Sequence, residues 1–197
     1  MERLPIVFVT SRAEKAREAE RLGFSIERLD VDLPEPQALD PSDIVAEKAR
    51  SAYAMLSRPV LVEDSGLAIR AWGGFPGALV KWVEASAGIP ALPRMLDAFE
   101  DRGATAICAI AYCDGGEIVT ARGEARGSIA AAPRGSGGFG WDTVFVPEGG
   151  DRTFAEMAPA EKDRVSHRRR AGSGTPGMGG TLQPDGGSDR PRRQVWR

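Results

Sequence analysis

The chain has 197 residues, enough for one domain that buries a core. Hydrophobic residues make up 42% and charged residues 27%, which is the balance of a globular protein. The net charge of -2 provides no general positive field for a nucleic acid, so a site for a polyanion must be a local group of Lys and Arg. No apolar run has the length of a membrane span, and the run at 4–9 is too short for a signal peptide, which predicts a cytoplasmic protein without a membrane partner.

The first half of the chain alternates strand-like and helix-like segments. Residues 4–9 are apolar and rich in β-branched types, and Thr10 and Ser11 then offer N-caps for a helix. Two prolines make residues 32–37 a loop. The predicted elements are strands at 4–9, 24–29 and 59–62, the last closed by residues 63–66, and helices from Thr10 to Gly23 and from Asp40 to Leu56.

The second half contains a hairpin signature, because Gly115 and Gly116 separate two strand-like runs. The predicted elements are helices at 78–87, 90–99 and 159–171, strands at 104–112, 117–126 and 144–146, and a glycine-rich loop at 132–142. From Gly172 onward Gly, Pro and Arg dominate and no periodicity remains. We therefore expect an ordered domain at 1–171 and a disordered tail at 172–197.

Strands that alternate with helices and are interrupted by a hairpin predict an α/β protein with a mixed sheet. Both cysteines, Cys108 and Cys113, fall in one of the predicted strands or at its end. Their odd spacing places them on opposite faces of a strand, which disfavours a disulfide between them. We expect two reduced, buried thiols.

Four acidic residues lie where a carboxylate would be expensive to bury or would indicate a function: Glu35, Glu63, Asp64 and Asp142. Asp64 follows a buried strand directly, and the carboxyl ends of strands are the usual active-site edge of an α/β sheet. Glu35 and Asp64 together suit Mg²⁺, which prefers one or two carboxylates completed by water and phosphate. The alternative is that Asp64 merely caps a turn.

The single histidine, His167, lies in a basic segment near the end of the predicted domain. On one continuous helix, Lys162, Ser166 and Arg169 would share one face, and Asp163, His167 and Arg170 another. Such a segment is usually a solvated face. Its functional alternative is a patch that recognises a polyanion or a base.

Two loops carry residue types that suit a nucleotide. Phe139-Gly140-Trp141-Asp142 offers aromatic rings for stacking on a purine and a carboxylate for ring N–H groups, although such aromatics often form a local core. The segment from Thr10 to Lys15 offers hydroxyls, backbone N–H groups and a cation at a helix start, which suits phosphates and also a plain N-cap.

Several short motifs follow one another in a fixed order along the chain. They are Val7–Lys15, Asp32–Gln37, Val60–Leu67, Gly73–Gly77, Lys81-Trp82, Phe139–Asp142, Thr153–Met157, Glu161-Lys162 and Ser166–Arg168. Taken together, these motifs resemble the inosine triphosphate pyrophosphatase family, which removes non-standard purine nucleoside triphosphates. The resemblance covers about residues 6 to 171.

The resemblance implies a long central sheet flanked by helices, two lobes with a nucleotide cleft between them, and a homodimer. It implies that Asp64 is the general base and that Glu35 and Asp64 bind Mg²⁺. The sequence leaves Mn²⁺ open as an alternative ion. The residues it assigns to phosphate are Thr10, Ser11, Arg12 and Lys15, with Lys48 and Lys81 adding charge. The residues it assigns to the rest of the substrate are Ser65, Phe139, Gly140, Trp141, Asp142, Lys162, His167 and Arg168.

The chemistry of that reaction agrees with the residues. Cleavage between the α- and β-phosphates requires a directed water, a base and cations on the leaving group, and yields a nucleoside monophosphate and pyrophosphate. A cation such as Arg168 favours the O6 acceptor of a 6-oxo purine over the amino group of adenine. This preference does not account for the exclusion of guanine.

Two departures from the family leave alternatives open. The family has Thr-Gly-Asn-x-x-Lys in its first loop, where this chain has Ser11 and Arg12 after Thr10, and the last helix breaks at Gly172. A nucleotide-binding homologue with impaired catalysis is therefore one alternative. A related pyrophosphatase for modified pyrimidine nucleotides is another. A nucleic-acid-binding module is disfavoured by the acidic charge balance.

Overall fold

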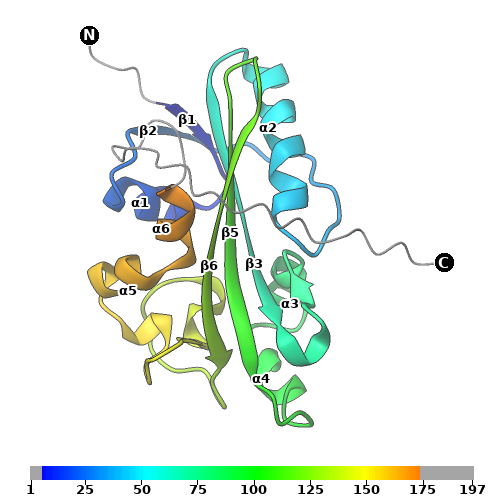
Figure 1. The fold of residues 1–197 in the computed structure, drawn as a ribbon, viewed down its shortest axis with the longest axis vertical. Coiled ribbons are helices and arrows are strands. Elements are labelled where there is room, and N and C mark those ends of the chain that lie inside the picture. Colours follow the sequence, from blue (N-terminus) through cyan, green and yellow to red (C-terminus); the bar gives the residue numbers. More distant parts are fainter. Residues whose placement is uncertain (1–5, 174–197) are drawn as a thin grey trace, which may run out of the picture.

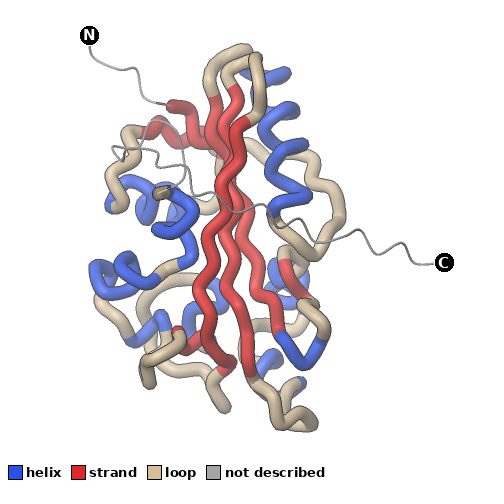
Figure 2. Tube along the Cα trace, viewed as in Figure 1, coloured by secondary structure: helices blue, strands red, loops and turns tan. Residues whose placement is uncertain are grey.

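The computed structural model describes residues 6–173. A seven-stranded mixed sheet in the order β2-β1-β3-β5-β6-β7, with β4 paired to β3, forms the centre of the molecule. Figures 1 and 2 show the long strands β3, β5 and β6 running the length of the molecule, with helices along both sides. The strands are β1 Ile6–Val9, β2 Ile26–Leu29, β3 Val60–Ile69, β4 Pro76–Gly77, β5 Gly103–Cys113, β6 Val119–Ile129 and β7 Phe145–Pro147.

The predicted mixed sheet and hairpin are confirmed. β1 pairs in parallel with β2 and β3, whereas β3, β5, β6 and β7 pair antiparallel, and β5 and β6 form the expected hairpin. The α-helices are α1 Ala13–Arg21, α2 Ser42–Leu56, α3 Val80–Ser86, α4 Ala91–Met95, α5 Pro159–Val165 and α6 His167–Gly172, with 3-10 turns η1 Arg70–Trp72, η2 Gly140–Thr143 and η3 Phe154–Glu156. The helix predicted at 90–99 is thus only five residues long.

At the end of the sheet that contains β1, apolar side chains on both faces are buried, because helices cover the strands on both sides. Val7 and Val9 pack with α2, whereas Phe8 points to the other face and packs with α1 and Ala171 of α6. Cys113 belongs to the first of these clusters and Cys108 to the second, and both thiols are free and buried, as predicted.

A third apolar cluster fills the other end of the sheet and defines a second lobe. It contains Leu67 and Ile69 of β3, Leu92 and Leu96 around α4, and the rings of Trp141, Phe145 and Phe154. The expected arrangement of two lobes on one long sheet is therefore present. Among residues 6–173, no helix combines the length and apolar character needed to cross a bilayer.

The prediction that β3 ends before Asp64 is wrong. The strand continues to Ile69 because β5 pairs with all ten of its residues, from Val60 opposite Cys113 to Ile69 opposite Ala104. β1 pairs only with Val60 to Val62, so Asp64 lies just beyond the carboxyl end of β1. Asp64 therefore lies at the carboxyl end of the parallel strands, as predicted, although β3 itself does not stop there.

The prediction of one continuous helix over 159–171 is also wrong. Ser166 has an extended backbone, with ψ 151, and separates α5 from α6. Its Oγ accepts a hydrogen bond from Arg169 N at 3.2 Å and so caps α6. The two helix faces expected from an unbroken helix do not exist, and His167 and Arg168 turn into the interior instead. Of the predicted tail at 172–197, residues 174–197 lie outside the described part of the chain.

The first helix begins later than predicted. Its N-cap is Arg12, which makes no side-chain cap, whereas Thr10 and Ser11 belong to the preceding loop. Thr10 Oγ1 accepts from Arg12 N at 3.2 Å, which fixes the loop rather than the helix end. The polar segment after β1 is thus a separate loop that leads into α1.

Gly123 of β6 allows α6 to pack directly on the sheet, since a Cβ there would overlap the backbone of Ala171 and His167. We predict that Gly123→Ala lowers the free energy of unfolding by about 1–3 kcal/mol, because α6 must move away from the strand. Urea denaturation measures this loss. The matched control is Gly116→Ala in the hairpin, whose Cβ would meet only Asp114 Oδ1 at 3.3 Å. Equal losses for both variants would contradict the packing role of Gly123.

Candidate active site

A cavity of about 300 Å³ lies between the two lobes. That volume is at the lower end of the range for small-molecule sites, about 300–1,000 Å³. All the site residues predicted from the sequence line it. They are Thr10, Ser11, Arg12, Lys15, Glu35, Lys48, Asp64, Ser65, Lys81, Phe139, Gly140, Trp141, Asp142, Lys162, His167 and Arg168.

The loop after β1 forms one wall of the cavity. Arg28 holds its backbone in place by donating to the carbonyls of Thr10 at 3.2 Å and Ser11 at 2.8 Å. In the first turn of α1, Lys15 Nζ lies 3.3 Å from Glu63 Oε1. A helix start and a lysine therefore face the cavity together, an arrangement that suits an anionic group.

A lysine separates the two carboxylates that were predicted to bind metal. Lys48 Nζ lies 2.6 Å from Glu35 Oε1 and 3.9 Å from Asp64 Oδ1, and Lys81 also pairs with Glu35. Burial acts to raise the pKa of Glu35, but Lys48 and Lys81 outweigh it and hold that pKa below its ordinary value. Glu35 is therefore ionised, with both lysines as counterions.

Asp64 is buried, and one of its carboxylate oxygens has no partner. Burial raises the pKa of Asp64, an effect that Lys15 and Lys48 oppose and that Glu35 and Glu63 reinforce. Its Oδ2 is buried and has no hydrogen-bond partner in the structure. A buried carboxylate oxygen without a partner is costly, which marks this atom as a contact for something that enters the cavity.

The donor set fits a divalent cation only if a ligand completes it. Within residues 6–173, no group of three or more His, Cys, Asp or Glu is arranged to hold a metal. Glu35 and the free oxygen of Asp64 supply two carboxylates on either side of Lys48. Mg²⁺ commonly binds through one or two carboxylates plus phosphate and water, so these residues fit a Mg²⁺ ion that arrives with phosphates.

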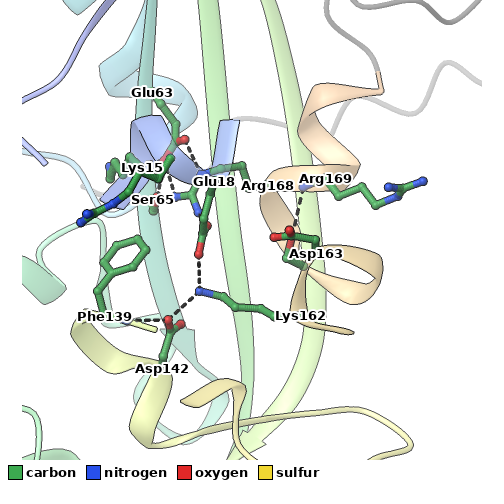
Figure 3. Close-up of polar contacts among 12 residues, drawn as sticks. Lys15, Glu18, Glu63, Ser65, Phe139, Asp142, Lys162, Asp163, Arg168 and Arg169 are labelled. Atoms are coloured by element: carbon green, nitrogen blue, oxygen red, sulfur yellow. Dashed lines mark hydrogen bonds and ion pairs between the residues drawn. The ribbon is translucent and has the colours of Figure 1, made fainter. Parts of the chain in front are cut away.

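Deeper in the cavity, a buried ion network joins α1 to the segment that contains α5 and α6. Lys162 Nζ lies 2.6 Å from Glu18 Oε1 and 2.5 Å from Asp142 Oδ2. Arg168 donates to Glu63 Oε2 at 2.6 Å and Oε1 at 2.7 Å, and also to Glu18. Figure 3 shows Glu18 between Lys162 and Arg168, so that one carboxylate holds both cations.

Sequence reasoning missed Glu18. It lies in a helix rich in Ala, Glu, Lys and Arg, which has the composition of a surface helix, yet only 4% of the residue is exposed. The available signal was its position. Glu18 lies three residues after Lys15 on the same helix face, and it is followed by Ala19, which is buried. Sequence reasoning also missed Glu84 of α3, which lines the cavity and carried no such signal.

Ionisation in this network is set mainly by burial. Burial lowers the pKa of Arg168 to about 9, which leaves the guanidinium charged at neutral pH. Burial raises the pKa of Asp142, whereas Lys162 and the Phe139 N–H lower it. Ser65 Oγ donates to Glu63 Oε1 at 2.7 Å and accepts from Arg168 at 3.3 Å, so Ser65 belongs to the same network.

Aromatic side chains form the wall beside these cations. The Phe139 ring has Lys162 Nζ at 4.9 Å and the Arg168 guanidinium at 5.8 Å from its centroid. Trp141, by contrast, is 8% exposed and packs against His167 with ring centroids 5.2 Å apart. Trp141 is therefore part of the core as well as the cavity wall, while Phe139 is the more accessible ring.

Together, the fold and the cavity define a class, an α/β protein whose cleft presents cations and carboxylates beside an aromatic wall. The chain belongs to the Ham1 family, whose sequence pattern matches residues 6–174.

Similar proteins support the assignment. The chain is 43% identical to a dITP/XTP pyrophosphatase of Methanopyrus kandleri, over 85% of this chain and 92% of that one. It is 42% identical to inosine triphosphate pyrophosphatase 1 of Trypanosoma cruzi, over 84% and 87%. Among solved structures, a dITP/XTP pyrophosphatase of Mycobacterium abscessus has a TM-score of 0.69 at 33% identity, covering 85% of this chain and 96% of that one. A HAM1 protein of Coxiella burnetii has a TM-score of 0.75 at 29% identity, covering 86% and 94%.

His167 generates a prediction about pH. Burial, followed by the charges of Lys162 and Lys15, lowers the pKa of His167 to about 3. In the unfolded chain this pKa is about 6.5. Between pH 6.5 and pH 3 the unfolded state therefore binds a proton that the folded state does not, and the free energy of unfolding decreases as pH falls below about 6.5. By pH 4.5 the loss attributable to His167 should be about 3 kcal/mol.

The measurement is the free energy of unfolding from pH 7 to pH 4.5 for the wild type and for His167→Gln. Since His167 is the only histidine, the difference between the two slopes isolates its contribution from that of the carboxyl groups. Identical slopes would show that His167 titrates normally and is not buried as described.

Proposed function

We propose that the protein hydrolyses non-standard purine nucleoside triphosphates such as ITP, dITP and XTP to the monophosphate and pyrophosphate. The observation that carries the proposal is the cavity itself, which gathers every residue expected from the sequence and leaves Asp64 Oδ2 without a partner. The names of the relatives from Methanopyrus kandleri and Trypanosoma cruzi give the same reaction class and the same purines.

In this proposal Asp64 takes the proton from the attacking water, since burial raises its pKa above that of an ordinary aspartate. Lys15, Lys48 and Lys81 neutralise charge on the pyrophosphate leaving group. Each of them contacts a carboxylate in the structure, so the phosphates would exchange with these acids as partners.

Glu35 and Asp64 would hold the Mg²⁺, or Mn²⁺ in its place. When bound, the ion would neutralise phosphate charge and lower the pKa of a water in contact with it. Lys48 lies between the two carboxylates and would contact the phosphates that complete the coordination.

At the other end of the cavity, Phe139 would stack on the base, with Trp141 and His167 closing the wall behind it. Arg168 stays charged at neutral pH, and together with Lys162 it would favour a 6-oxo group over the amino group of adenine. Asp142 would accept from the base or hold Lys162 in place, as it does at 2.5 Å.

We also propose that the protein is a cytoplasmic homodimer. Support for a dimer comes from large apolar side chains that remain exposed in neighbouring segments, Leu39 at 44%, Phe75 at 42% and Trp82 at 57%. Light scattering would then give twice the chain mass of 21.0 kDa.

The test of the reaction is pyrophosphate release from ITP, XTP, GTP and ATP with and without Mg²⁺. We predict that ITP and XTP are cleaved far faster than ATP and GTP, and that Asp64→Asn lowers kcat by a factor of about 10² to 10⁴ because the base is lost.

The matched control is Asp97→Asn, which changes the same functional group at a side chain that is 68% exposed and outside the cavity. Its kcat should equal that of the wild type. If ITP binds to the wild type without any release of pyrophosphate, the protein is a nucleotide-binding homologue without catalysis and the proposed function is wrong.

A further inference from the structure

One ion pair joins two segments of the cavity wall that are far apart in sequence. Arg12 Nη2 lies 2.7 Å from Glu84 Oε2. Arg12 precedes α1 at the end of the loop after β1, whereas Glu84 lies in α3, and both side chains line the cavity.

The pair also lies against the glycine-rich loop. A Cβ on Gly140 would be 3.6 Å from Arg12 Nη1 and 3.7 Å from Glu84 Oε2. The positive φ of 57° at Gly140 suits a residue without a side chain, and a Cβ there would be in van der Waals contact with both members of the ion pair. Three segments of the cavity wall therefore meet at Arg12 and Glu84.

Exposure distinguishes this pair from the deeper ones. The side chains of Arg12 and Glu84 are 39% and 31% exposed, compared with 2% for both members of the Arg168–Glu63 pair. A buried pair is expensive to break because one charge is left without a partner. A half-exposed pair is screened by water and contributes little, so Arg12 can change partners at small cost.

We propose that Glu84 is the resting counterion of Arg12 and that the polyphosphate of the nucleotide displaces it. Glu84 thereby sets how tightly the cleft holds the substrate's phosphates and the pyrophosphate product. The proposal rests on the proposed function, since it takes the occupant of this cleft to be a polyphosphate. Arg12 suits the exchange because its planar guanidinium binds carboxylate and phosphate in the same way.

A ligand that binds Arg12 must therefore compete with Glu84 for its guanidinium. Binding is weakened by the free energy of the Arg12–Glu84 pair, and after cleavage Glu84 recaptures Arg12 as pyrophosphate leaves. Removing the carboxylate of Glu84 should therefore tighten the binding of polyphosphates. The size of the effect follows from the strength of an exposed ion pair, about two- to five-fold in Kd.

The experiment is a double-mutant cycle with Glu84→Gln, Arg12→Gln and the double variant. Its probe is inorganic tripolyphosphate, bound with Mg²⁺ and measured by calorimetry, with KM for ITP and inhibition by pyrophosphate as second readouts. We expect Glu84→Gln to lower Kd, KM and the inhibition constant by the same two- to five-fold factor, and Arg12→Gln to raise them. In the Arg12→Gln background, Glu84→Gln should give no gain beyond its effect on net charge.

The matched control for net charge is Glu27→Gln. Glu27 forms a comparable exposed pair with Arg58 at 2.8 Å but does not line the cavity, so its removal measures the effect of one lost negative charge alone. Should Arg12→Gln fail to fold, Arg12→Lys replaces it in the cycle, because lysine lacks the planar fork and should weaken the coupling.

Two results would overturn the proposal. If the gain from Glu84→Gln is as large in the Arg12→Gln background, Glu84 acts through its field and not as a counterion. If Glu84→Gln weakens binding, Glu84 contacts the ligand directly. A wild type that fails to cleave ITP would contradict the proposed function. Tripolyphosphate binding does not require hydrolysis, so the double-mutant cycle would still test the role of Glu84 as a counterion.

Discussion

Arg168 places a full positive charge inside the protein, where only 1% of the residue is exposed. A buried charge without partners costs several kcal/mol, so the fold has to bring carboxylates to it. Glu63 comes from β3, Glu18 comes from α1, and Arg168 itself follows the break at Ser166. Because Glu18 also binds Lys162, which binds Asp142, the requirement extends to the glycine-rich loop. Neutralising Arg168 therefore fixes the relative positions of the elements that form the deep end of the cavity.

The same logic, with less burial, governs the shallow end. Lys15, Lys48, Lys81 and Arg12 each contact a carboxylate, so the cations of the described cavity are neutralised before any ligand arrives. In the proposed function, polyphosphate binding is then an exchange of counterions at these four cations. The Arg168–Glu63 and Lys162–Glu18 pairs are deeply buried and would remain, whereas both members of the Arg12–Glu84 pair are partly exposed and that pair would open at small cost. This division explains how a cleft rich in acidic residues can still suit a polyanion.

Much of the fold was predictable from local pattern, because buried strands and the Gly115-Gly116 turn leave clear signals in composition. Local pattern failed where tertiary partners override it. The acidic residues at 63 and 64 suggested a strand end, yet β3 continues because Arg168, Lys15 and Lys48 neutralise them within the sheet. The burial of Glu18 left little local signal, since its partners Lys162 and Arg168 lie more than 100 residues away in sequence. The extended Ser166 interrupts a segment whose composition suits a helix, and Arg168, two residues later, reaches Glu63 of β3. The candidate site residues were found as a set through the family's motifs, and their pairing came from the structure.

In the proposed reaction, Asp64 directs water at the phosphorus nearest the nucleoside. Asp64 adjoins Ser65, which accepts a hydrogen bond from Arg168, and its Oδ1 lies 3.9 Å from Lys48 Nζ while its Oδ2 has no partner. In the proposed function Arg168 would contact the base and Lys48 the phosphates, so Asp64 would lie between them. Hydrolysis of ITP in ¹⁸O-labelled water, followed by mass spectrometry of the products, tests this directly. We predict that the label enters inosine monophosphate and that pyrophosphate leaves unlabelled, because the attacked phosphorus stays with the nucleoside. Label in pyrophosphate, or release of orthophosphate and inosine diphosphate, would show that water attacks a different phosphorus.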